Sequence, residues 1–493
     1  MKRNLLYLLA ALLVLSSTAC VGNEPENEST VQETDVAVEN NEPVETTRAE
    51  AKDGLPDELN LNGETINFIV VKECAQYDAL GESGGDIVFD AVYNRNLKVE
   101  DRLNTKLNYT VYGNGIEHDA MAQEITNSVF ADSDDYNVVM QRGPQAFKLS
   151  LQGIYQDLNN NTYIDVSKPW WWGECIADLS INTEKMYFLT GDISLSTFLF
   201  TTSCFFNKSM MADYSFSVEE LYETVENGKW TYDVFEEYCS SVYRDIDGDG
   251  TASANDKYAF SWLGWNSSYF TRSAGLRYID RDADGYPVLA IHTEKNISYL
   301  ETLNRILHEN NYAYALPSGD YQELAKYFTS GQNLFMMGRL IWVTGVYTNN
   351  LRDMEDPYGI IPYPKFTEDD PYMAGTGNSG NHIAVPVTCR NFDAASAVIE
   401  AMCAENYRTV FPAMYETALK AKYSDASIDS QMIDLIHDSV YNDFATMSGL
   451  DIILDGLANS GKNDFASAYA SSESSIQKSL NDMIEKYKQG GHN

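Results

Sequence analysis

Short apolar runs alternate with amphipathic stretches over the first third of the chain. Residues 66–71 form a mostly apolar run typical of a buried strand, and apolar residues at helical spacing follow over 88–103. A strand is then predicted over 106–111, a helix over 121–130 and a strand over 136–140. This alternation predicts an α/β fold, with helices on both faces of a parallel or mixed sheet.

A β-branched and aromatic run ends the stretch 168–208, which opens with three tryptophans and passes a Gly191-Asp192 corner. Threonine, phenylalanine and cysteine fit a covered, pleated surface, so the run predicts a buried strand. We expect the chain to pass here from a first lobe into a second one, with the functional groove between the lobes.

The pattern beyond residue 228 predicts further helices and strands. Thr231 is a candidate N-cap for a helix, and Trp230 before it is a hydrophobic staple rather than a ligand contact. Glycines gather at 375–380, ahead of an apolar run. The predicted elements are helices over 296–308, 319–328 and 472–488, and strands over 258–265, 334–347, 358–364 and 382–387.

Length and charge limit the functional classes. The chain has 493 residues, more than one ordinary core accommodates. Its formal net charge of -39 disfavours nucleic acid and anionic membrane surfaces as partners. The 33 Tyr, 20 Phe and 7 Trp suit the apolar faces of sugars, although most of these rings are expected in the core.

The N-terminus carries the pattern of an export signal. Two basic residues precede an apolar stretch and small residues, so 1–19 is predicted to be a signal peptide. Cys20 follows, as at a bacterial lipoprotein cleavage site, and would carry lipid such as palmitate; an ordinary secretory signal is the alternative. Residues 20–57 are acidic and polar and predict a disordered tether. We expect an extracytoplasmic protein held at the cell membrane by its lipid anchor only.

One acidic loop has the spacing of a calcium site. Asp245, Asp247 and Asp249 alternate, Gly250 permits a sharp turn, and Asp256 stands at the closing position. The remaining predicted ligands are the Thr251 carbonyl and Ser253. A strand is predicted after the loop instead of a helix, so we expect structural Ca²⁺ and no switch; the alternative is a metal-free acidic turn.

Six cysteines follow Cys20, without a C-x-x-C pair, so neither a zinc site nor a thioredoxin-type site is predicted. The sequence leaves their pairing open. Walker, Gly-x-Ser-x-Gly and His-Glu-x-x-His motifs are absent from the sequence, and no two carboxylates are marked by spacing as a glycosidase pair.

The order of several segments resembles the family 1 extracellular solute-binding proteins of the maltose-binding type, which are lipoprotein receptors of bacterial carbohydrate ABC importers. The resemblance covers roughly residues 60–488. It rests on 90–96, 165–171, 191–192, 206–208, 229–231, 338–347 and 358–365. A calcium-like loop also occurs in large members of that family.

The resemblance implies a two-lobed α/β fold, each lobe a mixed sheet flanked by helices, hinged by crossover segments. The first lobe would hold 58–193 and 338–376, and the second 194–337 and 377–493. Arg142 and Asp192 would hold sugar hydroxyls, while Trp265 and Tyr347 would stack on rings. The full set of implied contacts is Gln141, Arg142, Trp171, Asp192, Trp265, Tyr269, Tyr347 and Asn378.

The sequence therefore predicts a monomeric, non-enzymatic binding protein that delivers a sugar or oligosaccharide to ABC permease subunits. A surface glycoside hydrolase, a binding protein for a non-sugar solute and a calcium-stiffened surface protein remain as alternatives.

Overall fold

The computed structural model describes residues 47–317, 319–344, 351, 354–420 and 426–489, and residues from Thr47 onward form one compact unit. The predicted signal peptide, Cys20 and Tyr347 lie outside the described residues. Among those that are described, no helix is long and apolar enough to cross a membrane.

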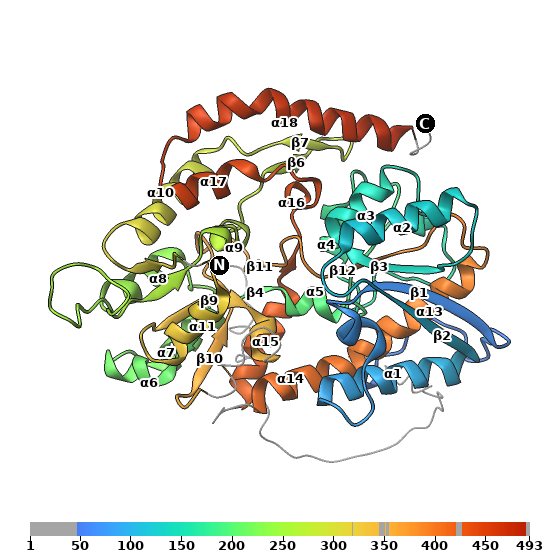
Figure 1. Ribbon diagram of the computed structural model, residues 1–493, viewed down its shortest axis with the longest axis horizontal. Helices are drawn as coiled ribbons and strands as arrows, with labels where there is room; N and C mark the ends of the chain where they lie inside the picture. The colour runs from blue at the N-terminus through green and yellow to red at the C-terminus, as the bar shows by residue number, and fades with distance from the viewer. Residues whose placement is uncertain (1–46, 318, 345–350, 352–353, 421–425, 490–493) are drawn as a thin grey trace, which may run out of the picture. The chain divides into compact units, whose positions relative to one another are not determined.

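The first sheet has the strand order β12-β3-β1-β2 (Figure 1). Strands β1, β2 and β3 are parallel, and β12 runs antiparallel to β3. Along β1, Phe68 and Val70 pack into one buried cluster while Ile69 and Val71 pack into the other, because successive side chains point to opposite faces. The strands are β1 (Glu64–Val71), β2 (Thr105–Tyr112), β3 (Val138–Arg142) and β12 (Asn381–Ala384).

Helices cover both faces of this sheet, as the alternating pattern predicts. Figure 1 shows α1 and α13 on one side and α2 and α3 on the other. Helix α1 begins after Asp86, whose side chain accepts a hydrogen bond from the Val88 amide. It ends at Asn104, which has the left-handed conformation. The four are α1 (Ile87–Leu103), α2 (His118–Phe130), α3 (Gly143–Ser150) and α13 (Phe392–Glu405).

The second sheet has the order β10-β4-β9, with both pairings antiparallel. All six residues of its central strand are buried, as expected for the β-branched and aromatic run. The other strands form three two-stranded sheets, which are β5-β8, β6-β7 and β11-β13. The strands are β4 (Thr202–Asn207), β5 (Phe260–Trp262), β6 (Ile279–Arg281), β7 (Pro287–Leu289), β8 (Ala313–Ala315), β9 (Phe335–Arg339), β10 (Tyr358–Ile361), β11 (Ala374–Gly375) and β13 (Val440–Tyr441).

The remaining helices surround the second sheet and the passages between the sheets. Thr231 caps its helix as predicted, with its hydroxyl accepting from the Val234 amide. Trp230 is buried and donates to the Pro362 carbonyl, which agrees with a packing role. The helices are α4 (Gly173–Leu179), α5 (Leu195–Leu199), α6 (Lys208–Asp213), α7 (Val218–Glu226), α8 (Tyr232–Ser240), α9 (Ser267–Ser273), α10 (Glu294–His308), α11 (Tyr321–Thr329), α14 (Phe411–Lys420), α15 (Ala426–Asp438), α16 (Phe444–Ser448), α17 (Ile452–Ser460) and α18 (Phe465–Lys488).

Single helical turns complete the fold. They are η2 (Arg48–Glu50), η3 (Gln76–Leu80), η4 (Leu158–Asn160), η5 (Gly264–Asn266), η6 (Leu340–Thr344) and η7 (Asn406–Val410).

Strand pairing differs from the predicted lobe boundaries at two segments. Strand β10 comes from 338–376, predicted for the first lobe, but it pairs with β4 of the second sheet. Strand β12 comes from 377–493, predicted for the second lobe, but it pairs with β3 of the first sheet. The chain therefore returns to the first sheet between β10 and β12. A strand of four residues carries no sequence mark of the sheet that it joins. The other boundaries stay predictions.

The predicted tether is wrong for residues 47–57, which pack against the folded part. The Arg48 guanidinium lies 4.5 Å from the ring centre of Tyr407. Asp53 accepts hydrogen bonds of 2.6 and 2.7 Å from Arg102. Leu55 is buried. These few anchoring side chains offset the polar composition of the segment.

All six cysteines that the structure describes are buried and free of disulfides: Cys74, Cys175, Cys204, Cys239, Cys389 and Cys403.

Candidate functional site

A cleft of about 1020 Å³ lies between elements packed on the two sheets. Helix α3 lines it on one side, and η5, α9 and the end of β9 line it on another. Segments of α16, α17 and α18 complete the wall; Figure 1 shows α18 running alongside β6 and β7. The volume is at the upper end of the roughly 300–1,000 Å³ typical of ligand sites.

An exposed tryptophan forms the aromatic part of the cleft. Trp265 is 48% exposed, and its indole nitrogen donates to the Gly319 carbonyl at 2.9 Å. Its ring meets that of the buried Tyr269 edge-on, with 5.8 Å between ring centroids. One hydrogen bond and one ring contact thus orient an indole that keeps half of its surface open, an arrangement suited to the apolar face of a ligand.

An arginine-centred polar group lies on the same wall. Arg272 donates to the carboxylate of Asp451 at 2.9 Å and to the Thr446 hydroxyl at 3.1 Å. The carboxylate of Asp455 is 3.7 Å away, and both aspartates line the cleft. The sequence reasoning missed this group. Its one local signal is the i,i+4 spacing of the two aspartates, which places them on one side of a helix.

A second arginine approaches from the end of β9. The Arg339 guanidinium carbon lies 4.6 Å from the ring centre of Tyr269 and 5.3 Å from that of Phe200. Its Nη1 donates to the Ser379 hydroxyl at 3.1 Å. The flanking loop brings the exposed Asn378 into the cleft wall.

Three of the predicted ligand contacts therefore line one cleft: Trp265, Tyr269 and Asn378. Tyr347 lies outside the described residues. The remaining four, Gln141, Arg142, Trp171 and Asp192, are not part of the cleft wall in the described structure, and each has a protein partner.

Gln141 and Arg142 belong to strand β3 itself instead of the loop after it. Gln141 is buried and donates to the Tyr155 hydroxyl. Arg142 forms an ion pair of 2.8 Å with Glu73, which also lies 3.1 Å from the His118 ring. Ligands in such sheets lie beyond the carboxyl ends of the strands. The predicted strand ended at residue 140, but β3 continues to Arg142, so both side chains belong to the sheet.

Trp171 and Asp192 are interior residues. The indole nitrogens of Trp170 and Trp171 both donate to Glu400, at 3.1 and 2.8 Å. Burial raises the pKa of Glu400 to about 7. Asp192 is fully buried, and its carboxylate accepts from Trp172 at 3.1 Å.

The three tryptophans thus supply buried hydrogen-bond donors to two acidic groups. Trp171 also borders a second cavity of about 290 Å³, together with Trp172 and His437.

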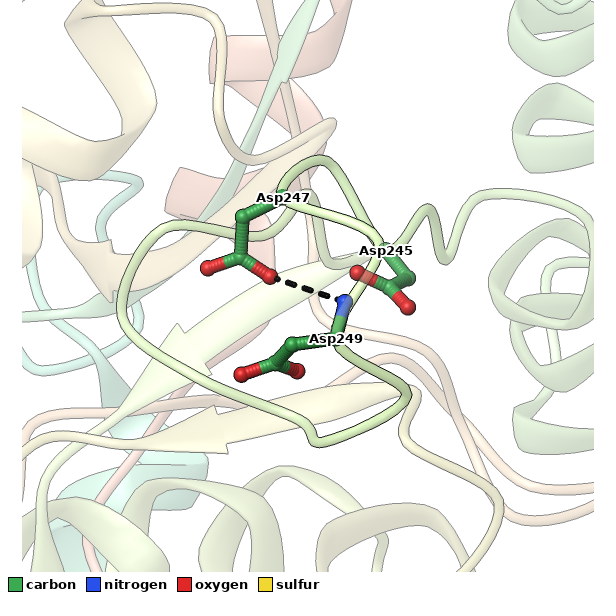
Figure 2. Close-up of side chains that lie close together, drawn as sticks. All are labelled: Asp245, Asp247 and Asp249. Atoms are coloured by element: carbon green, nitrogen blue, oxygen red, sulfur yellow. Dashed lines mark hydrogen bonds between the residues drawn. The ribbon is translucent and has the colours of Figure 1, made fainter.

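The acidic loop brings three carboxylates together. Oxygens of Asp245, Asp247 and Asp249 all lie within 4.8 Å of one another, and the three side chains are exposed (Figure 2). Asp245 accepts from the amides of Gly248 at 2.7 Å and Gly250 at 2.8 Å. Both glycines have positive φ, at 72° and 75°, which lets the chain curl around the carboxylates.

The closing acid of this loop is engaged by backbone groups. Asp256 is fully buried and accepts from the amides of Ile246 at 2.9 Å and Ser253 at 2.8 Å. A bridge between Arg244 and Lys257 closes the neck, and β5 follows, so the predicted strand after the loop is confirmed. Three convergent oxygen donors on a wrapped loop fit the coordination that Ca²⁺ prefers.

No protein-family model matches the chain, and no curated protein sequence matches it. Solved structures do. The galacto-N-biose-/lacto-N-biose I-binding protein of Bifidobacterium longum, in complex with lacto-N-biose, matches with a TM-score of 0.56 and 12% identity, over 86% of this chain and 98% of that one.

Two further structures match over similar lengths. A cyclo/maltodextrin-binding protein, complexed with maltotetraose, has a TM-score of 0.54 and 10% identity, over 89% of this chain and 98% of that one. UgpB from Mycobacterium tuberculosis, complexed with glycerophosphocholine, has a TM-score of 0.51 and 16% identity, over 86% of this chain and 99% of that one. The chain has the two-lobed solute-binding-protein fold. The predicted two-lobed α/β class is confirmed. The first sheet is mixed, as predicted, but the second sheet is antiparallel instead of mixed.

Proposed function

We propose that this protein is the substrate-binding component of an ABC-type importer, which captures a sugar or oligosaccharide between its lobes and delivers it to the permease. The observation that carries the proposal is the exposed Trp265 ring on the same cleft as the Arg272–Asp451 pair. Sugars offer apolar ring faces and hydroxyls, and this wall offers a stacking surface beside charged hydrogen-bonding groups.

The solved structures support the same function. Two of them are binding proteins in complex with lacto-N-biose and with maltotetraose. We propose binding without covalent chemistry, so an oligosaccharide incubated with the protein should remain intact. The glycerophosphocholine complex of UgpB favours a second candidate, capture of a non-sugar solute in the same cleft.

We further propose an extracytoplasmic monomer held at the cell membrane through lipid on Cys20. The acidic stretch between this cysteine and Thr47 would connect the lipid to the folded part. Support comes from the basic, apolar and small-residue order ahead of Cys20.

The acidic loop is proposed to hold structural Ca²⁺. Asp245, Asp247 and Asp249 would supply carboxylate oxygens, Thr251 its carbonyl and Ser253 its hydroxyl or a water. Asp256, which accepts from two backbone amides, would contribute at the closing position.

A thermal-shift screen of the full chain against mono- and oligosaccharides tests the main proposal. A sugar that binds the folded state raises the melting temperature, because only that state contains the cleft. Glycerophosphodiesters belong in the same screen. A shift with these and with no sugar would replace the sugar proposal by its alternative, and release of shortened sugars would make the protein a hydrolase.

A further inference from the structure

The β6–β7 hairpin is anchored on the second sheet. Strand β7 leads into α10, whose Tyr299 ring centre lies 5.3 Å from that of Tyr232, the first residue of α8. One turn along α8, the ring centre of Phe235 lies 5.3 Å from that of Phe335 in β9. Because these ring contacts connect the hairpin to the second sheet, it belongs to the second lobe.

Helix α4 and the segment after it are anchored on the first sheet. In this segment, Leu189 exchanges two backbone hydrogen bonds with Ile383 of β12, at 2.9 and 2.8 Å. Ile176 of α4 and Met186 are buried in the same cluster as Phe68 of β1. The helix and the segment therefore belong to the first lobe.

Arg281, at the end of β6, reaches from the hairpin to the end of α4. Its Nη1 donates to the Ile181 carbonyl at 2.6 Å, and its Nη2 donates to the Asp178 carbonyl at 2.8 Å. The last carbonyls of a helix have no partner within that helix, and here the second lobe supplies a donor to them. The guanidinium carbon also lies 5.3 Å from the ring centre of Phe444 in α16. One side chain thus joins the two lobes.

Two neutral hydrogen bonds flank Arg281. The Asn182 side-chain amide donates to the Asp284 carbonyl, in the turn of the hairpin, at 2.9 Å. At the end of α18, which runs alongside β6 and β7 in Figure 1, the buried Tyr487 donates its hydroxyl to the Asn182 carbonyl at 2.8 Å. We call the contacts of Arg281, Asp284 and Tyr487 with residues 178–182 the interlobe latch.

The interlobe latch lies beside the ligand cleft. Phe444, next to the Arg281 guanidinium, meets Phe147 edge-on with 5.3 Å between ring centroids, and Phe147 lines the cleft. On α18, Lys486 lines the cleft and directly precedes Tyr487 of the latch. Lobes that move apart on this side of the cleft must therefore break the latch.

The latch consists of hydrogen bonds between protein groups. All four acceptors are main-chain carbonyls, those of Asp178, Ile181, Asn182 and Asp284. Water can replace the partner of each group at a modest net cost, so these bonds can open and form again. Since they involve no ligand atom, they favour the closed arrangement of the lobes before a ligand binds.

We propose that the interlobe latch holds the two lobes closed over the cleft and must open for a ligand to enter or leave, with Arg281 as its central positioning residue. The effect on ligand exchange rests on the proposed binding function, whereas the latch itself does not. Release should be slowed by the latch, because its bonds must break before the lobes separate.

Small-angle X-ray scattering and hydrogen–deuterium exchange on the full chain, without added sugar, test the latch. We expect Arg281→Ala to have a larger radius of gyration than the wild type. Backbone amides of 176–189 and of the hairpin should exchange about fivefold faster or more, because loss of the guanidinium frees both sides of the latch. Tyr487→Phe removes one hydroxyl and keeps the ring, so it should change both measurements in the same direction but by less.

Arg244→Ala is the matched control. Arg244 donates to the carbonyls of Ser241 and Tyr243, at 3.0 and 2.7 Å, and its guanidinium carbon lies 5.1 Å from the ring centre of Tyr214. It makes the same kinds of contact as Arg281, but with residues of the second lobe only. The substitution should therefore leave the radius of gyration and the exchange of 176–189 unchanged.

The effect on ligand exchange has its own measurement. A sugar that raises the melting temperature in the thermal-shift screen should dissociate about three- to tenfold faster from Arg281→Ala than from the wild type in stopped-flow experiments. Equal dissociation rates would overturn the role of the latch in release.

Two further results would overturn the latch itself. An unchanged radius of gyration in Arg281→Ala, with faster exchange confined to the end of α4, would make Arg281 a local helix cap. Equal changes in Arg281→Ala and Arg244→Ala would mean that the effect is not specific to the contacts between lobes. If no solute in the screen binds, the proposed function is overturned, while the scattering result still decides whether the latch exists.

Discussion

The Nε2 atom of His437 lies 2.9 Å from the carboxylate of Asp192, inside the protein. This contact ties helix α15 to the crossover that the chain takes between its two sheets. Burial lowers the pKa of His437, but the Asp192 carboxylate outweighs this effect, and the pKa is raised to about 9. The hydrogen bond between Nδ1 and Asp438 also raises the pKa of His437, whereas the positive charge of Arg48 lowers it.

This ion pair predicts a stability that falls in alkali. Because the pKa of His437 is higher in the folded state than its ordinary 6.5, the stabilisation is fully present below about pH 6.5 and is lost as the pH rises through about 9. The loss should be at most about 3 kcal/mol. Urea unfolding between pH 6 and 9.5 measures it, and His437→Gln should flatten the slope. Equal slopes for both proteins would contradict the role of this pair.

Trp265→Ala should weaken binding of the cognate sugar by ~1–3 kcal/mol, because the substitution removes a stacking surface from the cleft. Calorimetry with one oligosaccharide measures the effect. Phe130→Ala is the control, since that ring is 77% exposed and does not line the cleft. Unchanged affinity in Trp265→Ala would remove this residue from the binding site.

Removal of calcium should lower the melting temperature of the wild-type protein. Free Ca²⁺ at one hundred times its dissociation constant should stabilise the fold by about 2.7 kcal/mol. The variant Asp247→Asn/Asp249→Asn should lose this response, because it removes two of the three convergent carboxylates. Asp280→Asn, in the β6–β7 hairpin, should retain it. A wild-type protein whose melting is the same with calcium and with a chelator has no such site.

Cys20→Ser should release the protein from the membrane fraction and abolish labelling by radioactive palmitate, if this cysteine carries the lipid. Fractionation of expressing cells with labelled palmitate measures both effects. Cys389→Ser is a matched cysteine control, and it should remain in the membrane fraction. Undiminished labelling of Cys20→Ser would place the lipid elsewhere.

Local patterns were sufficient to predict β1, β2, α1, α2 and α10. Strand β1 is a short apolar run buried on both faces, and each of the other four elements buries one side of its own pattern. Pairing between distant segments was not predictable in the same way. The strand partners of β10 and β12 are 150 or more residues away in the sequence, and strands of four residues do not specify them.

In the candidate site, too, local sequence predicted single residues but not the contacts between distant ones. Trp265 and Tyr269 were predicted, and both reach the cleft. The Arg272–Asp451 pair was missed because its two members are 179 residues apart, and nothing around either one marks it as a cleft residue. Asp192 was predicted as a ligand contact, yet its carboxylate is occupied by Trp172 and His437, partners that only the folded chain brings to it.

The six buried thiols have a consequence for how this protein can be studied. Since none of them forms a disulfide, the denaturation midpoint should not depend on reductant. Burial raises the pKa of the Cys204 and Cys403 thiols, so neither is a reactive thiolate at neutral pH. Alkylation then requires local opening of the chain around each sulfur. Cys204 lies in the second sheet and Cys403 on the helix beside the first, so their labelling rates would report separately on the opening of the two lobes.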